Sequence, residues 1–235
     1  MDKGYTVFED LAVKDYQEVW DYQEQLFAEV VDVKLHNRDN TSDLKPITNH
    51  LLFVEHPHVY TLGKSGVQNN LLINEQFLKQ INATFYKINR GGDITYHGPG
   101  QLVGYPILDL EELGLTVKTY IHNLEEAIIQ TLAEYGIKSE RLDGATGVWL
   151  DTTVPGKSRK ISAIGVKASR YVSMHGFALN INTDLSYFNH INPCGFVDKG
   201  VTSMEKELGR KIDMQEVKDL LLKKLVEIFN LQLNK

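Results

Sequence analysis

The order of helix-like and strand-like segments constrains the fold of this chain more than any other feature of its sequence. Apolar residues at helical spacing predict long helices over residues 14–35 and 117–135, the second ended by Gly136. A third helix is predicted to open with a capping box formed by Asp213 and Glu216. Because helices and strands do not alternate regularly, the pattern predicts an α+β fold: a mixed, largely antiparallel sheet flanked by helices.

The strand-like segments are short, rich in aromatic and β-branched residues, and separated by turn-forming residues. They are HLLFVEH (50–56), HVYTLG (58–63), TFYKIN (84–89), QLVGYPILDL (101–110), TGVWL (146–150), RKISAIGVKAS (159–169) and SMHGFALNIN (173–182). A short helix is predicted between the second and third of these strands, at residues 75–81. We interpret TFYKIN and QLVGYPILDL as the arms of a hairpin whose long connection is the glycine-rich stretch between them.

Length and composition exclude several classes of protein. The 235 residues contain no repeat and no Pro/Ser-rich linker, so we expect one catalytic domain over residues 1–235. A single cysteine excludes an internal disulfide. The start lacks a signal-peptide pattern and no apolar run approaches about 18 residues, so we expect a cytoplasmic protein with no membrane partner. The net charge of -6 argues against nucleic acid as a partner.

One segment departs from this acidic balance. Between Asp151 and Asp184 the chain carries no acidic residue, and its basic residues are Lys157, Arg159, Lys160, Lys167 and Arg170. Two interpretations stay open: a docking face for an anionic partner, or a solvated strand face that has collected lysines.

The stretch RGGDITYHGPGQL, residues 90–102, is unusually rich in glycine. It matches neither a Walker A loop nor a GxGxxG fingerprint, which disfavours binding of a nucleoside triphosphate. Glycines around Tyr96 and His97 suit a slot for an extended apolar chain, walled by backbone and an aromatic ring. The alternative is a long hairpin loop with ordinary turn glycines.

Cys194, in NPCGF, is the one thiol of the chain. A lone cysteine is often a buried filler, but Pro193 and Gly195 predict a turn on which a thiol can be exposed. A nucleophilic thiol needs activation, and the candidates are His175, His97 and the basic segment around Lys160. A Cys-His-Asp hydrolase is one possibility, although the spacing selects no histidine.

Three long motifs in one order give the chain a resemblance to a known family. The segments RGGDITYHGPGQLVGYPI, GKSRKISAIGVKASRYVSMHGFALNI and INPCGF resemble those of the lipoyl(octanoyl) transferases, over roughly residues 51–204. The resemblance implies a fold similar to the biotin/lipoate ligase catalytic domain. It also implies transfer of an octanoyl or lipoyl group from acyl carrier protein to a lysine of a lipoyl domain, with no cofactor and no metal.

The resemblance also assigns roles to residues. Cys194 would carry the acyl group as a thioester, and Lys160 would lower the pKa of its thiol and act as acid and base. The residues that would line the acyl site are Arg90, Gly91, Gly92, Asp93, Ile94, Thr95, Tyr96, His97, Ala163, Ile164, Gly165, Gly176, Phe177 and Ala178. At Asp93 some relatives carry glutamine, which is a tolerable departure. Nothing is carried over onto the first 45 or the last 25 residues.

The chemistry of the implied reaction agrees with these residues. Conversion of a thioester to an amide is downhill, so no phosphate-binding loop is needed, and a thiolate both attacks and leaves readily. The expected partners are octanoyl-acyl carrier protein and the lipoyl domains of 2-oxoacid dehydrogenases and of the glycine cleavage H protein. Two alternatives are an ATP-dependent lipoate or biotin protein ligase and a non-catalytic module that binds lipoyl domains.

Overall fold

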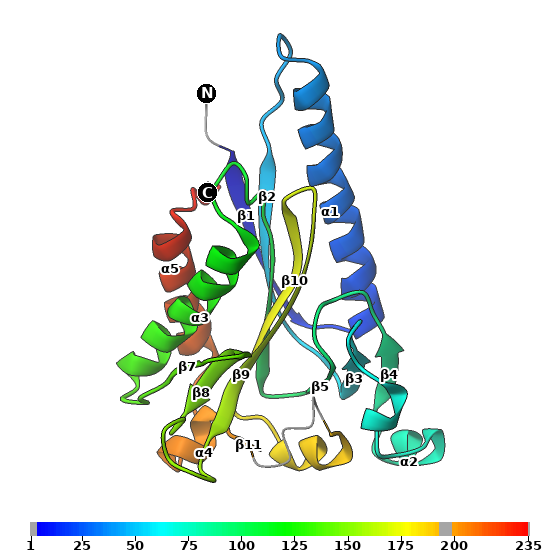
Figure 1. The fold of residues 1–235 in the computed structure, drawn as a ribbon, viewed down its shortest axis with the longest axis vertical. Helices are drawn as coiled ribbons and strands as arrows, with labels where there is room; N and C mark the ends of the chain where they lie inside the picture. Colours follow the sequence, from blue (N-terminus) through cyan, green and yellow to red (C-terminus); the bar gives the residue numbers. More distant parts are fainter. Residues whose placement is uncertain (1–3, 193–198, 235) are drawn as a thin grey trace.

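A large mixed sheet forms the centre of the computed structural model, which describes residues 4–192 and 199–234 (Figure 1). Its strand order is β1-β2-β6-β10-β9-β8-β7, with β11 paired to β9. The strands are β1 (Tyr5–Val13), β2 (Thr48–Glu55), β6 (Gln101–Ile107), β7 (Glu140–Leu142), β8 (Ala145–Leu150), β9 (Arg159–Ser169), β10 (Val172–Asn180) and β11 (Gly200–Val201). The β1–β2 and β9–β11 pairs are parallel and the other pairs are antiparallel.

Helices cover both faces of this sheet. Helix α1 (Tyr16–Asp39) lies on one face, and α3 (Val117–Glu134) and α5 (Met214–Phe229) lie on the other (Figure 1). Strand β2 shows the consequence in its sequence: Leu51 and Phe53 pack toward α3 and α5, whereas Leu52 and Val54 pack toward α1. A strand buried on both faces is apolar at every position, as LLFV is. The predicted α+β fold with flanking helices is therefore confirmed.

A second, three-stranded sheet lies near the N-terminal end of α1. Its order is β4 (Thr84–Lys87), β3 (Val59–Leu62), β5 (Ile94–His97), and it is accompanied by α2 (Glu75–Gln80) and the short helix η1 (Gln68–Asn70). The remaining elements, η2 (Leu185–His190) and α4 (Met204–Leu208), precede and follow β11. Within the described ranges, no helix has both the length and the apolar character that a membrane crossing requires.

The predicted hairpin of TFYKIN and QLVGYPILDL is wrong. Strand β4 pairs in parallel with β3 in the small sheet, whereas β6 pairs with β2 and β10 in the large one. Part of the glycine-rich stretch is itself a strand, β5, which pairs with β3. The stretch therefore carries the chain from one sheet to the other, and these pairings join residues far apart in sequence.

The helix boundaries follow their capping residues. Asp15 accepts hydrogen bonds from the Gln17 and Glu18 backbone amides and so begins α1. At α5, Asp213 accepts from the amides of residues 215 and 216, which makes it the cap that the sequence predicts. The reciprocal capping box, however, is found at α3, between Thr116 and Thr119.

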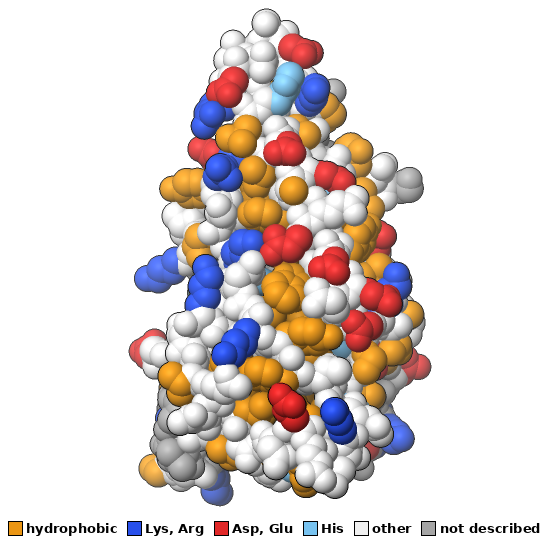
Figure 2. All heavy atoms as spheres, turned by 90° about the vertical axis from the view of Figure 1, so that its right-hand side faces the viewer, with side chains coloured by type: hydrophobic (Ala, Val, Ile, Leu, Met, Phe, Trp, Pro, Cys, Tyr) orange, Lys and Arg blue, Asp and Glu red, His pale blue; other side chains and the backbone are white. Residues whose placement is uncertain are grey.

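The basic segment does not form one continuous docking face. Arg159 pairs with Glu207 and Asp151, and Lys167 pairs with Glu24. The exposed Lys157 and Arg170 flank opposite ends of the 11-residue strand β9, roughly 35 Å apart at about 3.3 Å per residue. The face seen in Figure 2 carries both acidic and basic side chains with hydrophobic ones between them. Of the two interpretations left open for the basic segment, these ion pairs favour a strand face that has collected basic residues.

Candidate functional site

A cavity of about 940 Å³ lies between the large sheet and the strand β5 with its preceding loop. Its walls come from β6, β8, β9 and β10 of the large sheet, from the glycine-rich stretch and from η2. This volume is at the upper end of the range for small-molecule sites. The cavity is therefore large enough for a substrate with an extended chain.

Most of the residues that the family resemblance assigns to the acyl site line this cavity. They are Arg90, Gly92, Asp93, Ile94, Thr95, His97, Ala163, Ile164, Gly165, Gly176, Phe177 and Ala178, and they are joined there by Lys160. The cross-strand pairs Ile164–Phe177 and Ala163–Ala178 bring the last two segments side by side. Three segments far apart in sequence thus form one site.

Of the assigned residues that the structure describes, Gly91 and Tyr96 lie outside the lining. The Tyr96 ring is fully buried among the rings of Tyr60 and Tyr187, and its hydroxyl lies 2.7 Å from Nδ1 of His58. Tyr96 therefore does not supply the expected aromatic wall, because its ring belongs to the core of the small sheet. Gly91 donates its amide to the Val166 carbonyl at 2.9 Å and so ties the loop to β9.

The glycines serve the path of the backbone more than they make room for a ligand. Gly92 and Gly100 have φ of +82° and +78°, a left-handed conformation that disfavours other residues. A Cβ at Gly100 would also lie 2.4 Å from the Asn182 carbonyl oxygen, whereas one at Gly92 would lie 3.4 Å from Arg90 Nη1. The turn-forming interpretation therefore explains these two glycines.

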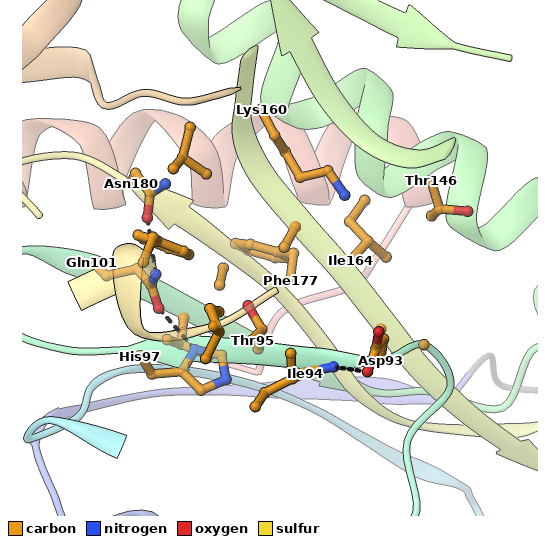
Figure 3. A pocket seen from close by; sticks show the side chains of 18 of the residues that line it. Asp93, Ile94, Thr95, His97, Gln101, Thr146, Lys160, Ile164, Phe177 and Asn180 are labelled. Atoms are coloured by element: carbon orange, nitrogen blue, oxygen red, sulfur yellow. Dashed lines mark hydrogen bonds between the residues drawn. The ribbon is translucent and has the colours of Figure 1, made fainter. Parts of the chain in front are cut away.

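Lys160 projects from β9 into the cavity (Figure 3). Its backbone pairs with Trp149 on β8 and with Val201 on β11, and its Nζ lies 4.5 Å from the centroid of the Trp149 ring. A cation over an indole face is held by the ring quadrupole. Strands on both sides and an aromatic ring thus fix the position of this amine.

The proposed nucleophile, Cys194, lies outside the described residues. The described residues that bracket this part of the chain, Asn192 and Lys199, both line the cavity. Gly200, which follows Lys199, lines it as well and pairs with Arg159 beside Lys160.

A chain of hydrogen bonds crosses the wall near His97 (Figure 3). Gln101 donates to the Asn180 side-chain oxygen at 2.9 Å, and Asn180 donates to the Thr202 carbonyl at 3.0 Å. The Gln101 oxygen therefore faces His97, whose Nδ1 donates to it at 2.8 Å. Burial lowers the pKa of His97 to about 3, with nearby His56 adding to the effect, so the ring is neutral at neutral pH.

A second buried histidine, His175, lines the cavity from β10. Its Nε2 lies 2.8 Å from the Asn89 side-chain oxygen. Burial lowers the pKa of His175 to about 3, and the charge of Arg90 contributes. Each candidate histidine therefore has one ring nitrogen engaged with a neighbouring amide side chain.

Sequence reasoning missed several residues of this site. Gln101, Asn180 and Trp149 line the cavity but were read only as members of strands. For Gln101 and Asn180 the available signal was an amide side chain at the end of a buried strand, since a buried amide requires a hydrogen-bonding partner.

Comparison with known proteins identifies relatives along nearly the whole chain. Residues 15–226 match the family model described as the lipoyl protein ligase A/B catalytic domain. An octanoyltransferase of Christiangramia forsetii is 60% identical over 225 residues, which is 95% of each chain. An octanoyltransferase of Bacteroides fragilis is 55% identical over 221 residues, which is 94% of this chain and 96% of that one.

Solved structures show the same fold at low sequence identity. A bipartite lipoate protein ligase of Thermoplasma acidophilum superimposes with a TM-score of 0.68 at 13% identity, covering 99% of this chain and 86% of that one. A lipoate-protein ligase A bound with ATP gives a TM-score of 0.63 at 14% identity, covering 99% and 88%. The sequence matches show that the chain belongs to the octanoyltransferases, within the family of the lipoyl protein ligase A/B catalytic domain.

Proposed function

We propose that this protein transfers an octanoyl group from octanoyl-acyl carrier protein, through a thioester on Cys194, to a lysine amine of a lipoyl domain in lipoic acid synthesis. The observation that carries the proposal is the convergence of the assigned acyl-site segments and Lys160 on one cavity. Two octanoyltransferases that are 60% and 58% identical to this chain, over 95% and 96% of its length, support the same chemistry.

The reaction divides into two balanced acyl transfers. The Cys194 thiolate attacks the thioester carbonyl, a carbon–sulfur bond forms to this chain, and the bond to the carrier breaks as the carrier thiol takes up a proton. The acceptor amine then attacks the new thioester. A carbon–nitrogen bond forms, Cys194 leaves as thiolate, and the amine releases one proton. The amide is more stable than the thioester, so no ATP is consumed.

Lys160 is proposed to serve both steps. An ammonium near a thiol favours the thiolate, and a desolvated lysine can give up its proton and act as a base toward the incoming amine. Two observations support the pairing with Cys194: the Lys160 amine enters the cavity, and Asn192 and Lys199 both line it.

The partners follow from the same reaction. We propose octanoyl-acyl carrier protein as the donor, and the lipoyl domains of 2-oxoacid dehydrogenases and the glycine cleavage H protein as acceptors. One solved neighbour is a lipoate protein ligase studied with its E2 lipoyl domain, which supports an acceptor of this kind. We also propose one catalytic domain, supported by the hydrogen bonds that join β1 to the last residues of the chain.

The proposed transfer and an ATP-dependent ligation differ in their acyl donor, which is an acyl carrier thioester in the first and a free acid in the second. The test incubates the protein with an unmodified lipoyl domain and either octanoyl-acyl carrier protein without ATP, or octanoate with ATP and magnesium. The mass of the lipoyl domain is then measured. We expect one octanoyl group added in the first arm. Modification in the second arm alone would establish a ligase, and modification in neither arm would leave a binding module.

A further inference from the structure

The cavity has two chemically different ends. Lys160 lies at one end and His97 at the other. Arg90 and His175 also line the cavity and interact electrostatically with His97, and we call these three residues the polar end. Arg90 packs over Gly165, where an added Cβ would lie 3.1 Å from Arg90 Cδ. Gly165 follows Lys160 by five positions on the extended β9, so the polar end begins roughly 15 Å from Lys160 along the strand. Figure 3 shows Lys160 and His97 on opposite sides of the cavity.

The walls between the two ends suit an alkyl chain. The small or apolar residues that line the cavity include Val103, Ala163, Ile164, Phe177 and Ala178. Each methylene group placed along these walls leaves water for apolar surroundings, which is favourable. Binding therefore improves with each added carbon until the chain reaches the polar end.

Hydrogen bonds hold two residues of the polar end in place. Arg90 Nη2 donates to the Thr61 carbonyl at 2.7 Å and to its hydroxyl at 3.0 Å, and Nη1 donates to the Gly91 carbonyl at 2.9 Å. His97 is held by Gln101, as described above. Arg90 and His97 are only 8% and 7% exposed, so neither can turn outward to let a longer chain pass.

His175 is held more firmly still. Asn89, which accepts its hydrogen bond, donates in turn to Glu24 of α1 at 2.9 Å, and Glu24 pairs with Lys167. The His175 backbone has a left-handed φ of +60°, and its amide donates to the Gln23 side chain at 3.2 Å. The remaining ring nitrogen, Nδ1, is buried and has no hydrogen-bond partner among the residues that the structure describes.

We propose that the polar end limits the length of the acyl chain that this enzyme accepts, with His175 as a specificity-determining residue. The inference rests on the proposed octanoyl transfer. A chain that extends into the polar end contacts the His175 and His97 rings and the Arg90 guanidinium, which are buried and held by hydrogen bonds. An alkyl group cannot hydrogen-bond to any of them, so the gain from burial turns into a loss.

The test measures single-turnover acylation of the wild-type protein with hexanoyl-, octanoyl-, decanoyl- and dodecanoyl-acyl carrier protein, followed by intact mass. We expect dodecanoyl to react at least tenfold more slowly than octanoyl. In His175→Leu and, separately, His97→Leu, an apolar side chain replaces a polar one. The ratio of the dodecanoyl rate to the octanoyl rate should then rise at least fivefold. His122→Leu, on the exposed side of α3, is the matched control and should leave the ratio unchanged.

The outcomes separate this inference from the proposed function. A wild-type protein that accepts dodecanoyl as fast as octanoyl overturns the inference without any variant. So does an unchanged ratio in the two variants when circular dichroism shows that they are folded. Failure of the wild-type protein to react with any acyl carrier thioester would instead overturn the proposed function.

Discussion

At the scale of single residues, the proposed chemistry depends on how Lys160 is held. Its backbone is paired on both sides, by β8 and by β11, and its Nζ lies against the Trp149 ring. Fixing a long flexible side chain costs conformational entropy. For Lys160 the fold bears this cost before any substrate binds. The amine is therefore placed before substrate binds, as an electrostatic partner for a thiol must be.

Substitutions of Lys160 separate its charge from its basicity. In Lys160→Met the ammonium is lost, so the pKa of Cys194 should rise by about one unit or more and acylation near neutral pH should slow. In Lys160→Arg the charge remains, but guanidinium does not deprotonate in this range. This variant should therefore form the thioester better than it passes the acyl group on to the lipoyl domain.

The measurement is the rate of alkylation of Cys194 as a function of pH, together with single-turnover rates for both steps. Because only the thiolate is alkylated, a higher pKa moves the rise of the rate to higher pH. Superimposable alkylation profiles for the wild type and both variants would show that Lys160 does not act on the thiol.

At the scale of elements, the Arg159–Glu207 pair attaches the chain that follows β11 to β9, next to Lys160. Arg159 donates to both carboxylate oxygens of Glu207 at 2.7 Å, a bidentate and partly buried contact. Thr202, whose amide donates to the Lys160 carbonyl, also contacts Glu207 through its hydroxyl. This ion pair is therefore structural, whereas the sequence left open whether Arg159 belongs to a docking face or to a solvated strand face.

The pair should contribute to stability in a pH-dependent way. Hydrogen bonds from Arg159 hold the pKa of Glu207 below its ordinary value of 4.5. A carboxylate with a lowered pKa stabilises the fold fully above its unfolded pKa, and the contribution is lost as the pH falls through the folded pKa. Arg159→Met should therefore lower the free energy of unfolding by about 1–2 kcal/mol at pH 7, and the difference should shrink below about pH 4.

Urea denaturation of the wild type and Arg159→Met across this pH range measures the effect. Arg38→Met, which removes an exposed pair with Asp39, is the matched control and should change stability little at any pH. A loss in Arg159→Met that is constant from pH 7 to pH 3 would contradict the ionic origin of the contribution.

Local sequence signals predicted some elements to within a few residues and failed where pairing is distant. Strand β9 and the start of α3 were predicted correctly because periodicity and flanking turns are local. The pairing of β4 with β3, and of β6 with β2 and β10, depends on contacts between distant segments that no local pattern encodes. Within the site, most of the residues that the motifs assigned line the cavity. They did not distinguish Tyr96, which packs into the small sheet, from its neighbours that face the cavity.

At the scale of the whole molecule, the cavity exists because two sheets meet. The large sheet supplies Lys160 and the small apolar residues, while the stretch that leaves the small sheet supplies Arg90 and His97. Helix α1 supports the polar end because its Glu24 accepts a hydrogen bond from Asn89, which contacts His175. The Lys160 amine, the apolar walls and the polar end therefore come from separate parts of the fold and depend on its correct assembly.

The most direct test of this mechanism is the mass of the chain itself after brief incubation with octanoyl-acyl carrier protein, without ATP and without an acceptor. The proposed mechanism predicts one octanoyl group, attached at Cys194 by peptide mapping. That group should be released when an unmodified lipoyl domain is added. Cys194→Ser, which keeps the size of the side chain but removes the thiol, should neither retain the group nor support transfer at the wild-type rate. Transfer to the lipoyl domain at the wild-type rate by Cys194→Ser would contradict the covalent mechanism.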